Sequence, residues 1–395
     1  MEIGYKSVVG LDAVKGLKTE QEPNLDRTRE EIERNIRKLQ SKLGSPMTDA
    51  DISLYGALKT NLRSINISDL TWRDPEANMI ISDDSSLVKN LGVRQKQLFL
   101  EPCENMKCVL PTSVTSRCDE FVNNFNNNEV PEVLRNIIHN KEWKENDDKL
   151  IERTNRILSV LREIWKNPAF ATSEMRSSQS EGTYITDVIV PLLRAGLEDL
   201  PNGTVCLSTA EWQSIASKTR KSLGSNEERT THPQKTPIGK KPDVMLMEKC
   251  GGKIFEIAYV ESSRIVCTNS KKDDDSVKLW RETQDGISFV NIACRLLSNQ
   301  FGIVGIQVSG EELYLNVLVK DANGIPRYFH LNQAQIPFSN DTSWRVIALV
   351  HLLLTLRNIT IVNKSLLMHA LEQANTRPPR NVNPSPTVSS PLNDN

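Results

Sequence analysis

Two segments of the first 170 residues carry apolar side chains at helical spacing. One spans residues 26–43 and the other spans residues 150–165. In the first segment the apolar positions are Ile32, Ile36, Leu39 and Leu43. Spacings of three and four line side chains along one face of an α-helix. We therefore predict that residues 1–170 form a mostly helical N-terminal region, with a loop over residues 102–128, where no period is clear.

A different pattern begins after this region. Ser178, followed three positions later by Glu181, has the S-x-x-E form of a capping box, which predicts the start of a helix. The apolar stripe behind it ends before Pro201, so we expect the helix to end there. A second helix is predicted over residues 209–221, and a loop over residues 222–241.

Stretches rich in β-branched residues, separated by turn signals, then predict a sheet. Two strands should fold back at Cys250-Gly251-Gly252, and three more are predicted at residues 303–308, 313–319 and 327–331. A helix over residues 274–298 should separate the two groups. This order of elements is typical of an α/β protein.

The end of the chain has two parts. Residues 344–356 predict a closing helix, and the Pro-, Ser- and Asn-rich residues after it predict disorder. We therefore divide the chain into the helical region of residues 1–170, an α/β domain of residues 171–370 and a disordered tail of residues 371–395.

Composition narrows the class of protein. The 395 residues hold 49 basic and 50 acidic side chains, so only a local patch could attract nucleic acid. The seven cysteines show no zinc-type spacing and predict reduced thiols. The N-terminus lacks a secretory signal pattern, and the longest apolar stretch, residues 346–356, is too short for a membrane span. We expect an intracellular protein, nuclear or cytoplasmic, with no membrane partner.

Acidic residues mark the predicted elements around the hairpin. Glu181 opens the apolar helix, Asp243 follows a proline before the first hairpin strand, and Glu256 and Glu261 lie on the returning strand. Lys278 follows on the next helix. Carboxylates on neighbouring strands supply the hard oxygen ligands that Mg²⁺ prefers. The order is acid on helix, acid on strand, acid on strand, lysine on helix.

This ordered set resembles the core of the PD-(D/E)XK, or restriction-endonuclease-like, superfamily. Asp243 and either Glu256 or Glu261 match its acidic motif, and residues 255–263 and 274–285 are also similar to fungal proteins built on that core. The similarity covers about 130 to 160 of the 395 residues. It implies an α/β fold with an αβββαβ core, which here carries extra β strands and follows a mostly helical N-terminal region.

The resemblance also implies metal-assisted hydrolysis of DNA or RNA. In that family one or two Mg²⁺ or Mn²⁺ ions bind the acids and activate the attacking water, while a lysine orients that water. For this chain the resemblance implies Glu181, Asp243, Glu261 and Lys278 as catalytic residues. The candidate metal ligands are Asp243, Glu261 and Glu256.

The chain departs from the family pattern at the motif lysine. That position is Ser263 if Glu261 is the motif glutamate and Ala258 if Glu256 is, and neither side chain carries an ammonium group. Lys278 would then have to reach the site from the following helix. Two earlier lysines of that helix, Lys271 and Lys272, are the less favoured substitutes.

Strand alternation bears on the choice of glutamate. An unbroken strand would put Glu261 on one face with Tyr259, and Glu256 on the other face with Ala258 and Val260. We favour Glu261 because it lies at the C-terminal end of the strand, where the chain can open to a substrate.

Each acid also has a simpler interpretation. Glu181 could serve only as the reciprocal cap of its helix, and Asp243 could merely turn the chain into the strand. Glu256 could pair with a basic neighbour. The acids of residues 273–275 could simply stabilise a helix N-terminus.

Basic residues gather just before the hairpin. Residues 218–241 hold seven Lys and Arg residues against two Glu residues, a local net charge of 7 − 2 = +5. Such a segment could bind nucleic-acid phosphates. The candidates are Lys218, Arg220, Lys221, Lys235, Lys240 and Lys241. A solvated loop is the alternative, because no aromatic residue is present there to stack on bases.

The sequence therefore favours a divergent metal-dependent nuclease. The alternative is a catalytically inactive nuclease-like fold that binds nucleic acid or acts as an effector-like protein-interaction module. We expect the N-terminal helices to bind a protein partner. The motifs of kinases, dehydrogenases, zinc hydrolases and serine hydrolases do not occur.

Overall fold

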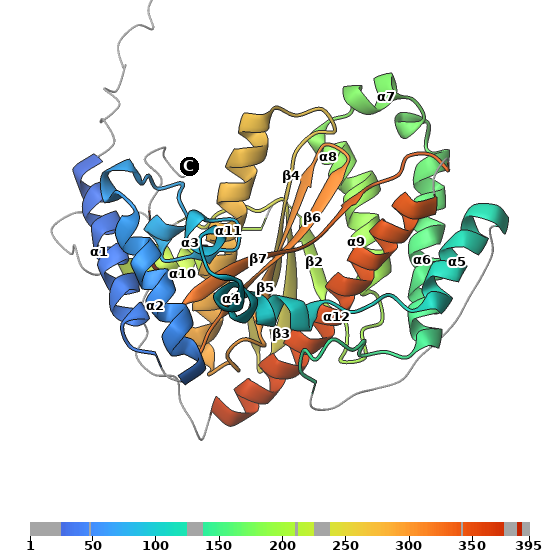
Figure 1. The fold of residues 1–395 in the computed structure, drawn as a ribbon. Helices are drawn as coiled ribbons and strands as arrows, with labels where there is room; N and C mark the ends of the chain where they lie inside the picture. The colour runs from blue at the N-terminus through green and yellow to red at the C-terminus, as the bar shows by residue number, and fades with distance from the viewer. Residues whose placement is uncertain are drawn as a thin grey trace, which may run out of the picture.

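A seven-stranded mixed sheet lies at the centre of the molecule, with helices on both sides (Figure 1). The computed structural model describes residues 25–46, 49–124, 137–209, 212–224, 238–340, 343–374 and 385–388. The strands, in the spatial order β1-β7-β6-β5-β4-β3-β2, are β1 (Ile81–Ser82), β2 (Cys206–Thr209), β3 (Val244–Cys250), β4 (Lys253–Ser262), β5 (Gly302–Ser309), β6 (Glu312–Lys320) and β7 (Pro326–Gln335). The predicted α/β class is confirmed.

Helices make up most of the remaining described chain. The α-helices are α1 (Leu25–Leu43), α2 (Asp49–Ser64), α3 (Ser86–Lys89), α4 (Val93–Met106), α5 (Thr112–Asn124), α6 (Asp147–Lys166), α7 (Ser173–Ser178), α8 (Glu181–Tyr184), α9 (Val190–Leu197), α10 (Ile215–Gly224), α11 (Asn269–Ala293) and α12 (Ser343–Ala374). Shorter turns are the 3₁₀ helices η1 (Ile67–Asp69), η2 (Glu76–Asn78) and η3 (Pro168–Phe170), and the π-helical turn η4 (Ile185–Ile189).

The middle of the chain builds one half of the sheet. Strands β2, β3 and β4 pair antiparallel in sequence order, and β5 then pairs parallel with β4. A parallel neighbour requires a crossover connection. Helix α11 forms that crossover and packs on β4 and β5. Strands β6 and β7 extend the sheet beyond β5 as antiparallel hairpins.

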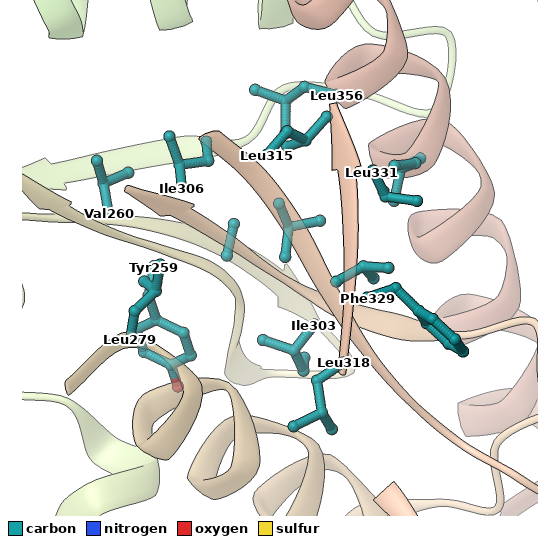
Figure 2. Packing of buried hydrophobic residues seen from close by; sticks show 14 of the residues in the cluster. Tyr259, Val260, Leu279, Ile303, Ile306, Leu315, Leu318, Phe329, Leu331 and Leu356 are labelled. Carbon is teal, nitrogen blue, oxygen red and sulfur yellow. The ribbon is translucent and has the colours of Figure 1, made fainter. Parts of the chain in front are cut away.

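Both faces of the sheet are buried, which explains the nearly continuous apolar runs of β4 and β5. Figure 2 shows Tyr259 and Leu279 on the side of α11, and Leu331 and Leu356 on the side of α12. The sheet and α11 approach closely at Gly286, where a Cβ atom would lie 2.8 Å from the Tyr259 hydroxyl oxygen. A side chain at this position would therefore push the helix away from β4.

The N-terminal region shares this core. Strand β1 pairs parallel with β7, and α5 and α6 pack on α12. One cluster of buried apolar residues runs from Ile36 of α1 through Phe99 of α4 to Phe329 of β7. The boundary predicted at residue 170 therefore does not separate two hydrophobic cores.

Several predicted elements are wrong in detail. The loop predicted over residues 102–128 contains the end of α4 and all of α5, because Val114, Cys118 and Phe121 recur at helical spacing and are buried. Thr209 ends strand β2 rather than beginning a helix, and α10 starts at Ile215.

The predicted disordered tail also needs correction. Helix α12 continues to Ala374, and residues 385–388 pack against the core. The Val388 carbonyl accepts a hydrogen bond from Arg281, and its N–H donates to Asn78. The rest of the predicted tail lies outside the described residues. Through these two hydrogen bonds, residues 385–388 connect α11 with η2.

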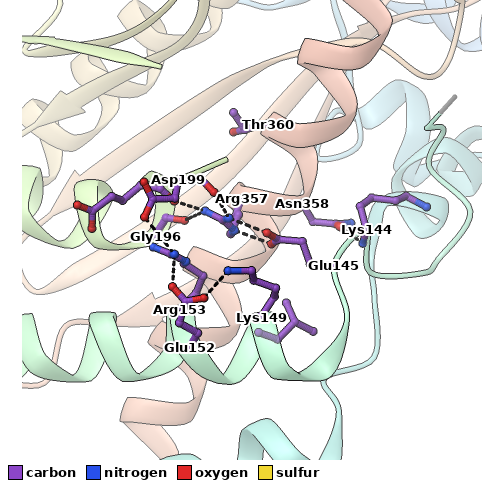
Figure 3. Close-up of polar contacts among 12 residues, drawn as sticks. Lys144, Glu145, Lys149, Glu152, Arg153, Gly196, Asp199, Arg357, Asn358 and Thr360 are labelled. Atoms are coloured by element: carbon purple, nitrogen blue, oxygen red, sulfur yellow. Dashed lines mark hydrogen bonds and ion pairs between the residues drawn. The ribbon is translucent and has the colours of Figure 1, made fainter. Parts of the chain in front are cut away.

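Helix α12 is long and apolar enough to span a membrane by length and composition, and 83% of its apolar window is buried inside the protein. It also carries buried charges. Arg357 is 1% exposed and donates to both oxygens of Glu145 at 2.5 and 2.6 Å (Figure 3). Its other donors reach the carbonyls of Gly196, Glu198 and Asp199 at the end of α9. One guanidinium thus ties α12 to the C-terminus of α9 and to Glu145, just before α6.

We predict that Arg357→Met strongly destabilises the protein, because it leaves the buried Glu145 carboxylate and three carbonyls without their donor. Removing one partner of a buried pair costs about 3–5 kcal/mol. Urea unfolding would measure the loss. The control is Arg156→Met, which removes an exposed ion pair to Glu198 and should cost no more than about 1 kcal/mol. Equal losses in the two variants would contradict this role.

Candidate functional site

Asp243 and Glu261 meet at the ends of two neighbouring strands. Val244 opposes Val260 in the β3–β4 ladder, so the residue before β3 lies beside the residue after Val260. The Asp243 Oδ2 atom accepts the Ser262 N–H at 2.7 Å. Asp243 is therefore bonded to the end of β4 and does more than turn the chain into β3.

Helix α11 brings basic and acidic side chains to this pair. The Lys278 Nζ atom lies 3.3 Å from Glu261 Oε2 and 2.9 Å from Asp275 Oδ1. Lys271 Nζ also lies 2.9 Å from Asp275 Oδ1. Lys271, Asp275 and Lys278 share one helix face because they lie four and three residues apart. Lys278, the lysine predicted to reach the site from the next helix, is therefore in contact with Glu261.

Glu181 stands at the outer edge of the cluster. Its Oε2 atom is 4.0 Å from Lys271 Nζ, and its charge adds to the effect of burial, which raises the pKa of Asp243. Ser180, not Ser178, caps α8 by accepting the Thr183 N–H, so Glu181 is the first residue of the helix. The predicted capping box is therefore wrong, and the Glu181 side chain faces Lys271.

The site holds several carboxyl groups, and burial raises the pKa values of two of them. Glu261 is 4% exposed, and burial raises its pKa to about 7. The charges of Asp243 and Asp275 act in the same direction, while Lys278 opposes them. Burial also raises the pKa of Asp243, against the Ser262 hydrogen bond. The carboxyl groups therefore gain from any further cation brought among them.

Two deeper acids add to this excess. Glu282, one turn after Lys278, is 2% exposed, and burial together with the Glu261 charge raises its pKa well above the usual range. Glu282 Oε2 and Asp275 Oδ2 are buried and have no hydrogen-bond partner among the described residues. Burial alone would lower the pKa of Lys278, but Glu261 and Asp275 raise it, so the amine stays protonated.

Glu256 does not join the cluster. Its carboxylate accepts hydrogen bonds from the Ser214 hydroxyl, the backbone N–H groups of Ile215 and Ala216 at the start of α10, and the Tyr259 hydroxyl. This is a helix-capping role, without the basic partner that we expected. As a predicted metal ligand, Glu256 is misplaced, which leaves Glu261 as the strand glutamate beside Asp243.

A β-bulge explains the error about strand faces. Ala258 pairs with Leu246 and Glu256 with Met247, so Ile257 has no opposite residue. One extra residue shifts the alternation by one. Glu256 therefore lies on the face of Tyr259, whose hydroxyl it accepts at 2.6 Å, rather than on the face of Ala258.

Ser263, the position at which the resemblance would require a lysine if Glu261 is the motif glutamate, carries no charge. Ser263 is fully buried, and both its N–H and its hydroxyl donate to the Val308 carbonyl. Of the two other lysines considered, Lys271 reaches Asp275, whereas Lys272 bonds the Tyr314 hydroxyl at 2.8 Å.

The acids of residues 273–275 do not lie at the helix N-terminus. Thr268 caps α11 by accepting the Lys271 N–H, so the helix begins at Asn269. Asp274 pairs with Arg73 at 2.8 Å, and Asp275 is fully buried between two lysines. The helix-dipole interpretation therefore fails for Asp275.

The basic candidates have different surroundings. Lys218 and Lys241 are exposed, and Lys221 is partly buried. Lys240 lies close enough for its charge to oppose the rise in the pKa of Glu282. Arg220 is buried and pairs with Asp285 at 3.0 Å, so it does not belong to a phosphate-binding surface. Lys235 lies outside the described residues.

Asp275, Glu282 and Gln307 were missed as site residues. Gln307 opposes Glu261 on β5, and its amide donates to the Lys272 carbonyl at 2.6 Å, which fixes the start of α11. Spacings of three and four link Asp275, Lys278 and Glu282, so a search of the helix for faces shared with Lys278 would have found both acids.

Another acidic group lies elsewhere. In the part of the chain described, three possible metal-ligand atoms from separate side chains lie within 4.8 Å of one another only at Asp83, Asp84 and His330. His330 Nε2 is 2.8 Å from Asp84 Oδ2, and its Nδ1 is 2.6 Å from Asn316 Oδ1. Asp84 and His330 are exposed, and an ordinary side-chain contact between them accounts for the short distance. Asp243 and Glu261 do not form such a group of three with any other His, Cys, Asp or Glu side chain that the structure describes.

Comparison with known proteins finds no matching family model, curated protein or solved structure.

We predict that Glu261→Gln raises stability at alkaline pH. Because the pKa of Glu261 is raised in the folded state, its contribution to stability is full below pH 4.5 and is lost as the pH rises through about 7. The difference corresponds to about 3 kcal/mol. Relative to the unaltered protein, the free energy of unfolding of the variant should therefore be higher at pH 8.5 than at pH 4 by about this amount. A pH-independent difference would contradict the raised pKa.

Proposed function

We propose that this protein is a divergent metal-dependent nuclease with a restriction-endonuclease-like core. The order of helix, three antiparallel strands, crossover helix and parallel strand supports the proposal. Fold alone does not establish function, so the proposal depends on the site. The observation that carries it is the position of Lys278 within 3.3 Å of Glu261, beside Asp243.

The acidic cluster fits a divalent cation. Asp243 and Glu261 offer hard carboxylate oxygens, and the unpartnered oxygens of Asp275 and Glu282 give the cluster more acceptors than its donors satisfy. Mg²⁺ usually takes one or two carboxylates and keeps several waters, so two neighbouring acids suffice. Asp243 and Glu261 would hold the ion, with Glu181 at the edge. A bound Mg²⁺ or Mn²⁺ would polarise a phosphate and lower the pKa of a water.

Lys278 has two roles in this proposal. As a protonated amine it cannot act as a general base, since Glu261 and Asp275 raise its pKa. It can donate a hydrogen bond to a water or to a phosphate oxygen. Asp275 holds the ammonium in place at 2.9 Å, and Gln307 holds the start of the helix that carries it. The ammonium also balances Glu261 when no other cation is near.

Substrate binding would use exposed lysines of α10 and of the segment before β3. Lys218 on α10 and Lys241, two residues before Asp243, are exposed. Lys240 lies near Glu282. Phosphate contacts of this kind position a nucleic acid without reading its sequence.

The alternative is a fold that has lost its chemistry. It is favoured by Ser263, which stands where the family has lysine and which donates to backbone. In that case Lys278 would serve only as a structural counter-ion for Glu261 and Asp275.

We expect the purified protein to cleave labelled DNA or RNA with Mg²⁺ or Mn²⁺ and not with EDTA. Asp243→Asn and Glu261→Gln should lower the rate at least about 100-fold, since each removes an interaction worth several kcal/mol. Lys278→Met should lower it about 100- to 1,000-fold, because it removes a positioned hydrogen-bond donor. The matched control is Asp273→Asn, an exposed acid on the same helix, which should not change the rate.

Two results would contradict the nuclease. One is an absence of cleavage on single- and double-stranded DNA and RNA with either metal. The other is metal-dependent cleavage that Asp243→Asn and Glu261→Gln leave unchanged, which would indicate a contaminating enzyme. Nucleic-acid binding without cleavage would support the inactive fold.

Metal binding should depend on pH. Because Glu261 must lose its proton to bind a cation and its pKa is about 7, Mn²⁺ affinity should rise up to about tenfold per pH unit below 7 and level off above it. Calorimetric titration with Mn²⁺ between pH 5.5 and 8.5 would measure this. Glu261→Gln should remove the dependence, and an unchanged dependence would place the ion elsewhere.

A further inference from the structure

A cavity of about 500 Å³ lies beside the C-terminal half of α11, away from the residues that carry the acidic cluster. Its walls come from the end of α1, from α11 and from the turn between β6 and β7. The lining residues of α11 are Gln284, Ile287, Ser288, Asn291 and Ile292, and neither Lys278 nor Glu282 of the acidic cluster is among them. The volume is within the range of small-molecule binding sites, roughly 300–1,000 Å³.

Lysines from two different elements face this cavity. Lys42 comes from the last turn of α1 and Lys320 from the end of β6, and the exposed Lys38 stands at the rim. Lys42 Nζ donates to the carbonyls of Asn323 and Gly324 rather than to a carboxylate. Within the described chain, the Lys320 ammonium has no hydrogen bond or ion pair.

The charges of these lysines are poorly compensated. Burial, together with the charge of Lys42, lowers the pKa of Lys320 to about 8. Burial also lowers the pKa of Lys42, against the attraction of Asp321. Asp321 is already engaged by Arg327 at 3.0 Å and by the Tyr55 hydroxyl. A bound anion would therefore reduce the electrostatic repulsion between the Lys42 and Lys320 ammonium groups.

A buried amide also lacks partners here. Gln284 lines the cavity and is fully buried, and neither its side-chain oxygen nor its nitrogen has a hydrogen-bond partner among the described residues. Leaving such a group unsatisfied costs about 1–3 kcal/mol. Gln284 offers a donor and an acceptor to a ligand.

Part of the remaining wall is apolar, and the side chains of Ser288, Asn291, Ser298 and Asp321 add polar groups to it. Ile287 of α11 and Phe301, just before β5, are each 1% exposed and line the same cavity as the lysines. Met79 adds a third apolar side chain. A few convergent polar groups on an apolar wall are typical of sites that bind a ligand with two chemically different ends.

We propose that this cavity binds a small molecule that joins a phosphomonoester to a flat apolar group, such as a mononucleotide. The phosphate lies at Lys42 and Lys320, where lysines act as point-charge phosphate ligands. The flat group lies against Ile287 and Phe301, and Gln284 bonds its edge. This site is separate from the proposed nuclease site and does not depend on that activity.

Calorimetric titration of the full chain in EDTA tests the proposal with two probes, adenosine 5′-monophosphate and phenyl phosphate. Both should bind more tightly than inorganic phosphate or adenosine. Lys320→Met and Lys42→Met should each weaken binding at least about tenfold, because each removes a charged donor. The matched control is Lys96→Met, an exposed lysine on α4, which should leave the affinity unchanged.

Three outcomes would overturn the site. Neither probe binding at 10 mM would exclude it. If adenosine binds as tightly as its monophosphate, the lysines do not contribute to the affinity. If inorganic phosphate binds as tightly as both probes, the apolar wall does not contribute to it.

A second measurement uses the unaltered protein and so does not depend on the folding of a variant. At pH 8 an amine-reactive ester should modify Lys320, because burial lowers its pKa to about 8 and leaves part of its amine unprotonated at that pH. Phenyl phosphate should protect Lys320 and leave Lys96 unprotected. Labelling of Lys320 that phenyl phosphate does not change would contradict binding in this cavity.

Discussion

The parallel pairing of β4 with β5 is the constraint on which the candidate site depends. A parallel neighbour needs a crossover, and α11 is long enough to cover β4 and β5 from end to end. Its close approach at Gly286 fixes the distance between helix and sheet. The crossover and the close packing at Gly286 hold α11 against the sheet. Lys278 of this helix can therefore reach Glu261 on β4. Asp243 completes the arrangement through its bond to the end of β4.

Charge balance explains why this arrangement favours a cation. Buried carboxyl groups lose hydration, and those that also repel one another resist ionisation. Glu261, Asp243 and Glu282 all have raised pKa values for this reason. Lys278 offsets part of the imbalance, and Asp275 holds it there. A divalent ion and the Lys278 ammonium would therefore interact with the same carboxylates. The carboxylates would coordinate the ion, and the ammonium would donate hydrogen bonds to them.

Periodicity predicted much of the fold from the sequence. The strands of the β5–β7 hairpins and helices α1, α6 and α11 follow from apolar spacing and turn residues, because local patterns decide them. The ends of α11 were misplaced by five residues, since the Thr268 cap lies before the first apolar position. Helix α5 was missed because its buried face rests on a valine, a cysteine and a phenylalanine among polar residues.

The candidate site was predictable only in part. The order of Asp243, Glu261 and Lys278 along the chain was sufficient to predict that they share one site. In the structure they are neighbours. The β-bulge at Ile257 leaves no mark in the sequence pattern, so the face of Glu256 could not be predicted. Burial of Asp275 was equally invisible, because an acid near a helix start is usually solvated.

The central claim is that Asp243 and Glu261 hold a divalent cation. A crystal of the protein soaked in Mn²⁺ at pH 8, measured for anomalous scattering, tests it most directly. The account predicts a strong anomalous peak between these two carboxylates, with the Lys278 ammonium moved away from Glu261. A peak only at Asp83, Asp84 and His330, or no peak at either place, would contradict it.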